Sequence, residues 1–191
     1  MTAVLPRIVV IGASAGAIQA LSVILPALPA GFALPILIVV HVPAQRANIL
    51  APLFQAKCRL PVREADDKEP ILPGTIYFAP PDYHMLVEAE GTISLSSDEP
   101  VLHSRPSIDV LFESAAHAFG PALIGIILSG ANADGAQGLR AIAQAGGTAL
   151  VEDPLAAYAQ AMPLAAIKAC PTARILSHDG IAHYLTKAGT S

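Results

Sequence analysis

The sequence predicts a three-layer α/β/α fold on a doubly wound, mostly parallel sheet of the Rossmann-like type, with a short antiparallel segment. Short β-branched apolar runs alternate along the chain with helix-periodic segments, which is the pattern of α/β proteins. Several of these runs are apolar at every position, as in strands that helices cover on both faces. A length of 191 residues suits one well-buried domain and is short for two, so we expect a single domain over residues 1–191.

The first half of the chain contains the clearest strand signals. The run Ile8–Ile11 is β-branched and stops at Gly12, and a second apolar run stops at Val40. Glu90 and Gly91 form a turn between two short runs, which we expect to pair antiparallel. The expected elements are strand Arg7–Ile11, helix Ala15–Leu25, strand Pro35–Val40, helix Ala47–Ala56, and short strands near Pro61–Glu64, Thr75–Ala79, Met85–Glu88 and Thr92–Ser96.

A strong helix signal opens the second half. Ser107 can cap this helix, and Ile108, Leu111, Phe112 and Ala115 share one of its faces. Strand-like and helix-like segments then alternate to the end of the chain. The expected elements are helix Ser107–Phe119, strand Ala122–Leu128, helix Gly135–Ala145, strand Thr148–Val151, helix Met162–Ala169, strand Arg174–Leu176 and helix Asp179–Lys187.

Charge and cysteine content argue against several functional classes. The net charge is -4, the pI is near 5.8 and the basic residues are scattered, so we expect no nucleic-acid partner. Cys58 and Cys170 fit no metal or redox spacing, so we expect reduced thiols and neither a metal nor a cofactor. Residues 8–40 carry no charge, but Pro26 and Pro29 would break a spanning helix. We therefore expect a cytoplasmic protein without membrane insertion.

A G-x-S-x-G sequence, Gly12-Ala13-Ser14-Ala15-Gly16, joins the first strand to the first helix. The pattern places Ser14 in a tight turn, where its hydroxyl stands clear of the backbone. The free amides of the first helical turn can stabilise an oxyanion there. Ser14 is therefore a candidate nucleophile, and a plain helix N-cap is the alternative.

A histidine and an aspartate follow two other strands. Sites in open α/β sheets form outside the carboxyl ends of the strands, so Ser14, His41 and Asp134 are expected to meet. A histidine can take the serine proton, and a carboxylate can orient the ring. A buried structural His41 and a helix-capping Asp134 are the alternatives. Spacing also leaves Asp82 and Asp153 open as orienting carboxylates, and His84 and His103 as bases.

Two better-known site types fit less well. The segment 12–17 is not G-x-G-x-x-G, and His41 stands where a dinucleotide-binding domain needs a ribose-binding acid. An α/β-hydrolase has the order serine, acid, histidine, whereas the order here is serine, histidine, aspartate. The pattern favours a different class of serine hydrolase.

Segments spread over nearly the whole chain match a known family in order. They are Val10–Gly16, Val39–Pro43, Gly74–Met85, Arg105–Phe112, Ile124–Gly130, Asp134–Gly135 with Gly138–Leu139, and Met162–Pro163. In these segments the chain resembles the catalytic domain of CheB, the protein-glutamate methylesterase of bacterial chemotaxis. The resemblance implies hydrolysis of γ-glutamyl methyl esters on a methyl-accepting chemoreceptor or similar helical signalling protein. Methanol is released, and receptor glutamines are often deamidated.

The resemblance also implies residue roles. It assigns the nucleophile to Ser14, the base to His41 and the orienting aspartate to Asp134. We expect oxyanion donors from the Ala15 and Ala131 amides. The remaining expectations concern the substrate groove, with walls from His84 and Met85, and with Arg105 shaping a turn or contacting an acidic receptor surface.

Two departures from the family bear on function. The family pattern Gly-Met-Gly-x-Asp has Ala131 for its methionine and Asn132 for its second glycine. This change leaves a serine carboxylesterase for a different ester as one alternative function. A docking module without turnover is a separate alternative. Well-known members also carry an N-terminal receiver domain, whereas the nucleophile strand begins here at Arg7. We expect no receiver domain, and either constitutive activity or control by a separate response regulator.

Overall fold

The computed structural model describes residues 7–42 and 49–190. The strands are β1 (Ile8–Ala13), β2 (Ile36–Val40), β3 (Val62–Glu64), β4 (Ile76–Phe78), β5 (His84–Val87), β6 (Ile93–Ser96), β7 (Leu123–Ile127), β8 (Thr148–Glu152) and β9 (Arg174–Leu176). The helices are α1 (Ala17–Ile24), α2 (Leu50–Gln55), α3 (Ile108–Phe119), α4 (Ala136–Gln144), α5 (Ala161–Ala169) and α6 (His178–Gly189), with a 3-10 turn at Gly120–Ala122. Residues 47 and 48 of the expected second helix lie outside the described residues.

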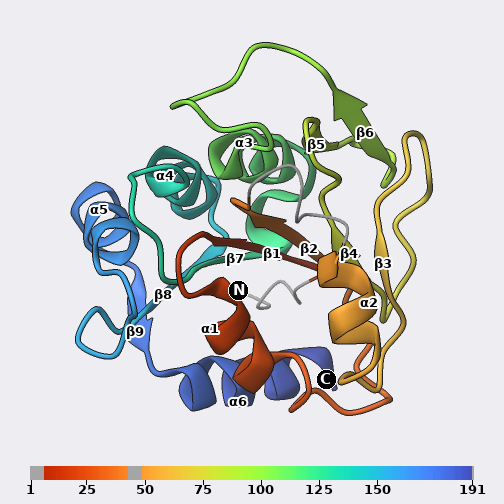
Figure 1. The fold of residues 1–191 in the computed structure, drawn as a ribbon, viewed down its shortest axis with the longest axis horizontal. Coiled ribbons are helices and arrows are strands. Elements are labelled where there is room, and N and C mark those ends of the chain that lie inside the picture. Colours follow the sequence, from red (N-terminus) through yellow and green to blue (C-terminus); the bar gives the residue numbers. More distant parts are fainter. Residues whose placement is uncertain (1–6, 43–48, 191) are drawn as a thin grey trace.

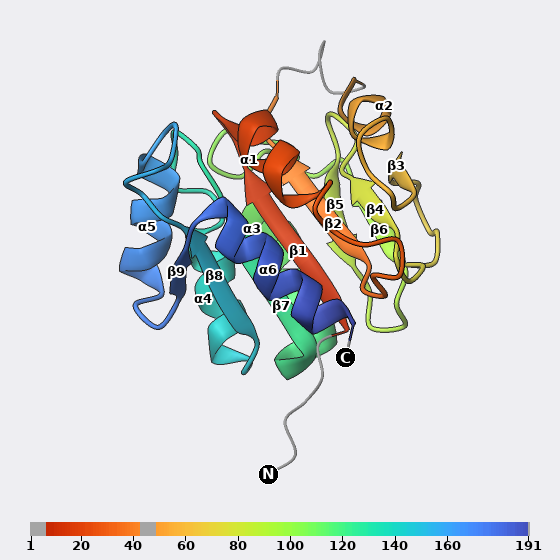
Figure 2. The same cartoon turned by 90° about the horizontal axis from the view of Figure 1, so that it is seen from below.

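The described residues form a seven-stranded sheet in the order β3-β4-β2-β1-β7-β8-β9, with all neighbours parallel. Strands β5 and β6 pair antiparallel in a separate sheet. Figure 1 shows helices on both sides of the large sheet, and Figure 2 shows α1 and α6 lying across one of its faces. The predicted three-layer fold with a short antiparallel segment is confirmed.

The central strand β1 is buried along its whole length because helices cover both faces of the sheet. Val9 and Ile11 pack in the core beneath α1, α2 and α6. Ile8 and Val10 alternate with them and pack in the second core, beneath α3, α4 and α5. The apolar run in the sequence therefore serves two cores at once.

The strand order of the sheet reverses at β1, which is its topological switch point. It first builds the side that contains β2 and later returns to build β7 on the other side of β1. This switch point is where open α/β sheets form a crevice. The helices that follow β1 and β7 begin at Gly16 and Gly135, whose φ angles are 89° and 93°. Both turns need this left-handed backbone, which glycine adopts without a steric penalty.

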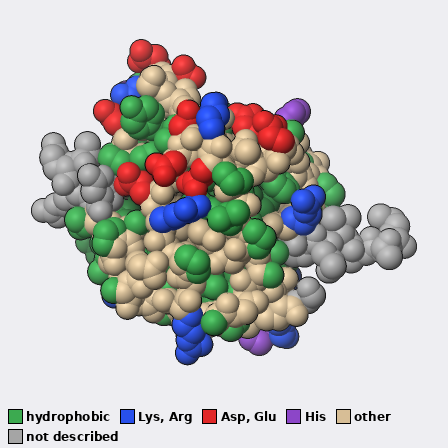
Figure 3. Space-filling model, turned by 90° about the vertical axis from the view of Figure 1, so that its right-hand side faces the viewer, with side chains coloured by type: hydrophobic (Ala, Val, Ile, Leu, Met, Phe, Trp, Pro, Cys, Tyr) green, Lys and Arg blue, Asp and Glu red, His purple; other side chains and the backbone are tan. Residues whose placement is uncertain are grey.

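The sheet edge at β3 carries charge. Arg63 and Glu64 are exposed there, and charged side chains on an edge strand oppose pairing with another chain. Figure 3 shows acidic side chains gathered on this face. Exposed acidic residues in this part of the chain include Glu64, Asp66, Asp67, Glu90, Asp98 and Glu99.

Among the helices that the structure describes, none has the length and apolar character needed to cross a membrane.

Candidate active site

Ser14 lies directly after β1, in the turn that leads into α1. Its backbone N–H donates to the Ser129 carbonyl at 2.9 Å, and its own carbonyl accepts from Ala17 N–H at 3.0 Å. The helix N-cap is Gly16, without a side-chain bond, so the alternative of Ser14 as a plain N-cap is wrong. The side chain is half-buried, and within the described residues its hydroxyl makes no hydrogen bond. The hydroxyl is thus available for chemistry.

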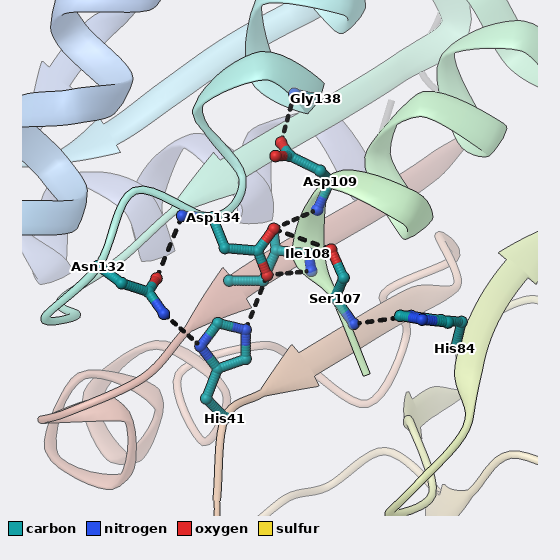
Figure 4. A network of polar contacts seen from close by, with 8 residues as sticks. All are labelled: His41, His84, Ser107, Ile108, Asp109, Asn132, Asp134 and Gly138. Carbon is teal, nitrogen blue, oxygen red and sulfur yellow. Dashed lines mark hydrogen bonds and ion pairs between the residues drawn. The ribbon is translucent and has the colours of Figure 1, made fainter. Parts of the chain in front are cut away.

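His41 lies directly after β2, beside Ser14. Ala13 and Val40 are opposite each other in the parallel pair, and His41 N–H donates to the Ala13 carbonyl at 3.0 Å. Ser14 and His41 therefore follow neighbouring strand ends, which are about 5 Å apart in a sheet. The His41 side chain is 12% exposed, and its Nε2 lies 2.8 Å from Asp134 Oδ2 (Figure 4). The structure brings the three sequence-predicted residues to one edge of the sheet.

The Asp134 carboxylate accepts four hydrogen bonds. Its Oδ2 accepts from His41 Nε2 and from Ile108 N–H at 2.7 Å. Its Oδ1 accepts from Ser107 Oγ at 2.9 Å and from Asp109 N–H at 3.0 Å. Two of these donors are amides of the first turn of α3, which have no partner inside the helix. Asp134 therefore caps α3, not the helix that follows it, and Ser107 donates to the aspartate in place of the predicted side-chain cap.

The hydrogen bonds around Asp134 keep it ionised. Burial would raise its pKa, but the bond with His41 and the donors from α3 outweigh burial and lower the pKa below its usual value. An ionised carboxylate only accepts hydrogen bonds, so the hydrogen-bond network assigns the proton to His41 Nε2. In the neutral ring, Nδ1 then carries the lone pair. Nδ1 is the atom at which His41 can act as a base.

Asp109, in the first turn of α3, is a second buried carboxylate, and its backbone N–H donates to Asp134. Its Oδ1 accepts from Gly138 N–H at 2.7 Å (Figure 4). Burial raises the pKa of Asp109 to about 6, and the negative charge of Asp134 adds to the shift. This residue had no assigned role in the sequence interpretation. The sequence contains no specific signal for it, because an acidic residue in the first turn of a helix is common and its burial here depends on packing against α4.

The expectation that His84 and Met85 line a substrate groove is wrong. Met85 is fully buried in the core beneath α3, and His84 is 2% exposed. His84 Nδ1 accepts from Ser107 N–H at 3.1 Å, and its Nε2 lies 3.0 Å from the Glu99 carbonyl. Both ring nitrogens are occupied by backbone groups, so His84 is not a competing base. His84 and Met85 are consecutive in β5, so their side chains point to opposite faces of the β5–β6 pair, and both are buried there.

Arg105 lines a cleft beside His41. Its guanidinium donates to Asp82 Oδ1 at 3.0 Å and to the carbonyls of Ser97 and Asp98 at 2.9 and 3.1 Å. Asp82 therefore pairs with Arg105 and does not orient His41. The cleft has a volume of about 290 Å³, and its walls are His41, Val42, His103, Ser104, Arg105 and Pro106.

The other competing residues lie elsewhere or at the rim. Asp153 accepts from Leu155 N–H at 2.9 Å, in the loop after β8, and so does not orient His41. His103 is exposed at the mouth of the cleft. Among the candidate carboxylates, Asp134 is the one that pairs with His41, and His41 lines the cleft.

The two predicted oxyanion donors are backbone amides that have no acceptor in the described part of the protein. Within the described residues, the N–H groups of Ala15 and Ala131 donate to no protein acceptor. Ala15 is held in place by its carbonyl, which accepts from Ser129 Oγ at 2.6 Å. Ala131 is exposed in the loop that follows β7. Both amides remain predicted donors.

Glu152 anchors the loop after β7, a role that sequence reasoning missed. It is 1% exposed at the end of β8. Its Oε2 accepts from Ser129 N–H at 2.6 Å, and its Oε1 lies 2.7 Å from His178 Nε2. Ser129 Oγ in turn accepts from Ala159 N–H at 2.8 Å. A glutamate that ends an apolar parallel strand was the available signal, because a buried charge requires partners.

Comparisons with known proteins identify the family to which this chain belongs. Residues 9–185 match the family model of the CheB methylesterase. A Leptospira interrogans protein, provisionally named protein-glutamate methylesterase/protein-glutamine glutaminase, is 48% identical over 174 residues, which are 91% of this chain and 90% of that protein. The protein-glutamate methylesterase/protein-glutamine glutaminase 2 of Pseudomonas savastanoi is 34% identical over 95% of this chain and 47% of its own length. The crystal structure of the Thermotoga maritima CheB methylesterase catalytic domain matches with a TM-score of 0.91 and 32% identity, over 95% of this chain and 98% of that chain. The chain belongs to the CheB methylesterase family.

Proposed function

We propose that this protein is a serine hydrolase that cleaves γ-glutamyl methyl esters on a methyl-accepting chemoreceptor or a similar helical signalling protein. The observation that carries the proposal is the His41–Asp134 pair, 2.8 Å apart, at the strand end next to Ser14. Relatives named for methylester hydrolysis and glutamine deamidation support the reaction class. A cleft that His41 lines adds support as open space next to the base, although Ser14 is not among its walls.

In the first half-reaction, Ser14 Oγ attacks the ester carbonyl carbon and its proton passes to His41 Nδ1. The carbonyl oxygen becomes an oxyanion, which the Ala15 and Ala131 amides stabilise. One such donor typically contributes about 3 kcal/mol to the transition state. Asp134 stabilises the imidazolium through Nε2. The bond from the carbonyl carbon to the methoxy oxygen then breaks, and methanol leaves with the proton from Nδ1.

In the second half-reaction, water replaces methanol. His41 Nδ1 takes a proton from the water, whose oxygen attacks the glutamyl ester on Ser14. The bond to Ser14 Oγ breaks, the serine recovers its proton from Nδ1, and the free glutamate carboxylate is released. A glutamine side chain can follow the same route with ammonia as the leaving group. The glutaminase part of the relatives' names favours this as a second activity.

Methanol release from methyl-labelled chemoreceptor membranes tests the proposal. The wild-type protein is compared with Ser14→Ala, His41→Ala and Asp134→Asn. Asparagine keeps the size of Asp134 but turns an NH2 group toward N–H donors, so its effect reports the acceptor role. We expect release by the wild type and a loss of at least 100-fold in each variant, on the order known for triad members.

A serine-reactive phosphonate probe separates the remaining outcomes. Labelling of Ser14 without methanol release would refute the receptor substrate and favour an esterase for another ester. Neither labelling nor release would refute catalysis and favour a docking module.

A further inference from the structure

Asn132 contacts the ring nitrogen of His41 that Asp134 does not use. Its Oδ1 accepts from Asp134 N–H at 3.1 Å, and its Nδ2 lies 3.5 Å from His41 Nδ1 (Figure 4). The backbone donor sets the orientation of the amide, because only the oxygen can accept from an N–H. The NH2 group therefore faces the lone pair of Nδ1. Asn132 and Asp134 hold the two nitrogens of one ring.

We infer that Asn132 is a positioning residue that keeps His41 in its neutral, Nε2-protonated form until Ser14 engages Nδ1. The inference rests on the proposed role of His41 as the base. An NH2 group stabilises a lone pair but has no acceptor to offer an N–H, so Asn132 opposes proton uptake from solvent at Nδ1. A contact of 3.5 Å is long and weak, which lets the serine hydroxyl displace it.

The charged groups around His41 determine how strongly the contact with Asn132 affects protonation of the ring. Asp134 is ionised and favours the protonated ring. The guanidinium of Arg105 is paired with Asp82 at 3.0 Å. Asp134 therefore favours protonation of the His41 ring at one nitrogen, and Asn132 disfavours protonation at the other. Among the described residues, the titratable and charged groups that face His41 or its partner are Asp134, Asp109 behind it, and the cleft residues His103 and Arg105.

Two substitutions separate this role from a role in shaping the loop. Asn132→Asp is nearly isosteric and keeps an oxygen for Asp134 N–H, but it turns a negative oxygen toward Nδ1. Asn132→Ala removes both contacts. A nearby negative charge favours the protonated ring, so we expect Asn132→Asp to move the acidic limb of the kcat/KM profile up by about 1 pH unit or more. Loss of one hydrogen bond predicts an upward shift of about half a pH unit in Asn132→Ala.

The profile is measured with the methyl ester substrate, or with a small nitrophenyl ester if the receptor is not cleaved. On the acidic limb, a shift of 1 pH unit lowers kcat/KM about tenfold. An activity loss at every pH, with the limb unmoved in both variants, would mean that Asn132 only shapes the loop. That result would overturn the inference.

Nitrogen NMR of the histidine rings provides a test that needs no turnover. It is made in the Ser14→Ala protein, with the His41 signals identified by their loss in His41→Gln. We expect a lone-pair-type Nδ1 signal with Asn132 present, and conversion to the imidazolium at higher pH with Asn132→Asp. The same titration in both proteins would overturn the inference. An inactive wild-type protein would refute the proposed function alone, since this titration still decides the role of Asn132.

Discussion

Asp109→Asn tests the energetic cost of a second buried carboxylate beside Asp134. Asp109 is 6% exposed, and burial, together with the charge of Asp134, raises its pKa from 3.8 to about 6. The folded protein therefore holds this proton at pH values where the unfolded chain has released it. Stability falls as the pH rises from about 4 to about 6 and stays lower above that window.

The size of the effect follows from the pKa difference. About two pH units of difference correspond to about 3 kcal/mol at pH 7, of which about 0.5 kcal/mol is already present at pH 4. Asparagine keeps an oxygen for the Gly138 N–H and carries no charge at any pH. The stability advantage of Asp109→Asn over the wild type is therefore expected to grow by about 2 kcal/mol between pH 4 and pH 7.

Urea unfolding followed by far-UV circular dichroism at pH 4, 5, 6 and 7 measures this difference. Comparing pH values removes any constant effect of the substitution. Asp98→Asn is the matched control, because Asp98 is exposed and its side chain makes no hydrogen bond among the described contacts. A stability difference that stays constant from pH 4 to pH 7 would refute the reasoning.

The remaining predictions concern the supports of the site. Ser107→Ala removes the hydroxyl that donates to Asp134 at 2.9 Å, and urea unfolding should show a loss of about 1–3 kcal/mol; an unchanged midpoint would contradict this bond's contribution. Gly16→Ala should lower the free energy of unfolding by about 2 kcal/mol, and by more than Gly91→Ala does. Both glycines have positive φ, but an added Cβ meets neighbouring atoms at Gly16 and open space at Gly91. Equal losses would show that this crowding has no effect. Glu152→Ala should lower stability by about 1–3 kcal/mol more than Glu152→Gln, since glutamine still accepts from the loop N–H; thermal unfolding of the pair checks this.

The central strands were predictable because burial on both faces leaves a simple trace in the sequence. The run at Ile8–Ile11 became β1, and the run that ends at Val40 became β2, with bounds close to those expected. The capping of α3 was not predictable in the same way. Ser107 stands at the right position, but its hydroxyl donates to a carboxylate 27 residues further along the chain. A local pattern contains no information about such a partner.

Selection among the competing site residues also required the three-dimensional arrangement. Asp82 and Asp134 both follow strands, yet one pairs with Arg105 and the other with His41. His84 and His41 both adjoin strands, yet His84 is enclosed by backbone groups. Each outcome depends on loops that meet only after the sheet has formed.

By itself, the sequence determined the layered fold, the family and the strand ends at which Ser14, His41 and Asp134 lie. Apolar periodicity and the rule that sites form at strand ends are local or topological, so they can be read without coordinates. The tertiary structure alone decided that Asp134 caps α3, that His84 and Met85 are buried, and that Asn132 faces His41 Nδ1. Hydrogen bonds act over about 3 Å between segments that are distant in the chain, and only the packed fold brings their donors and acceptors within that range.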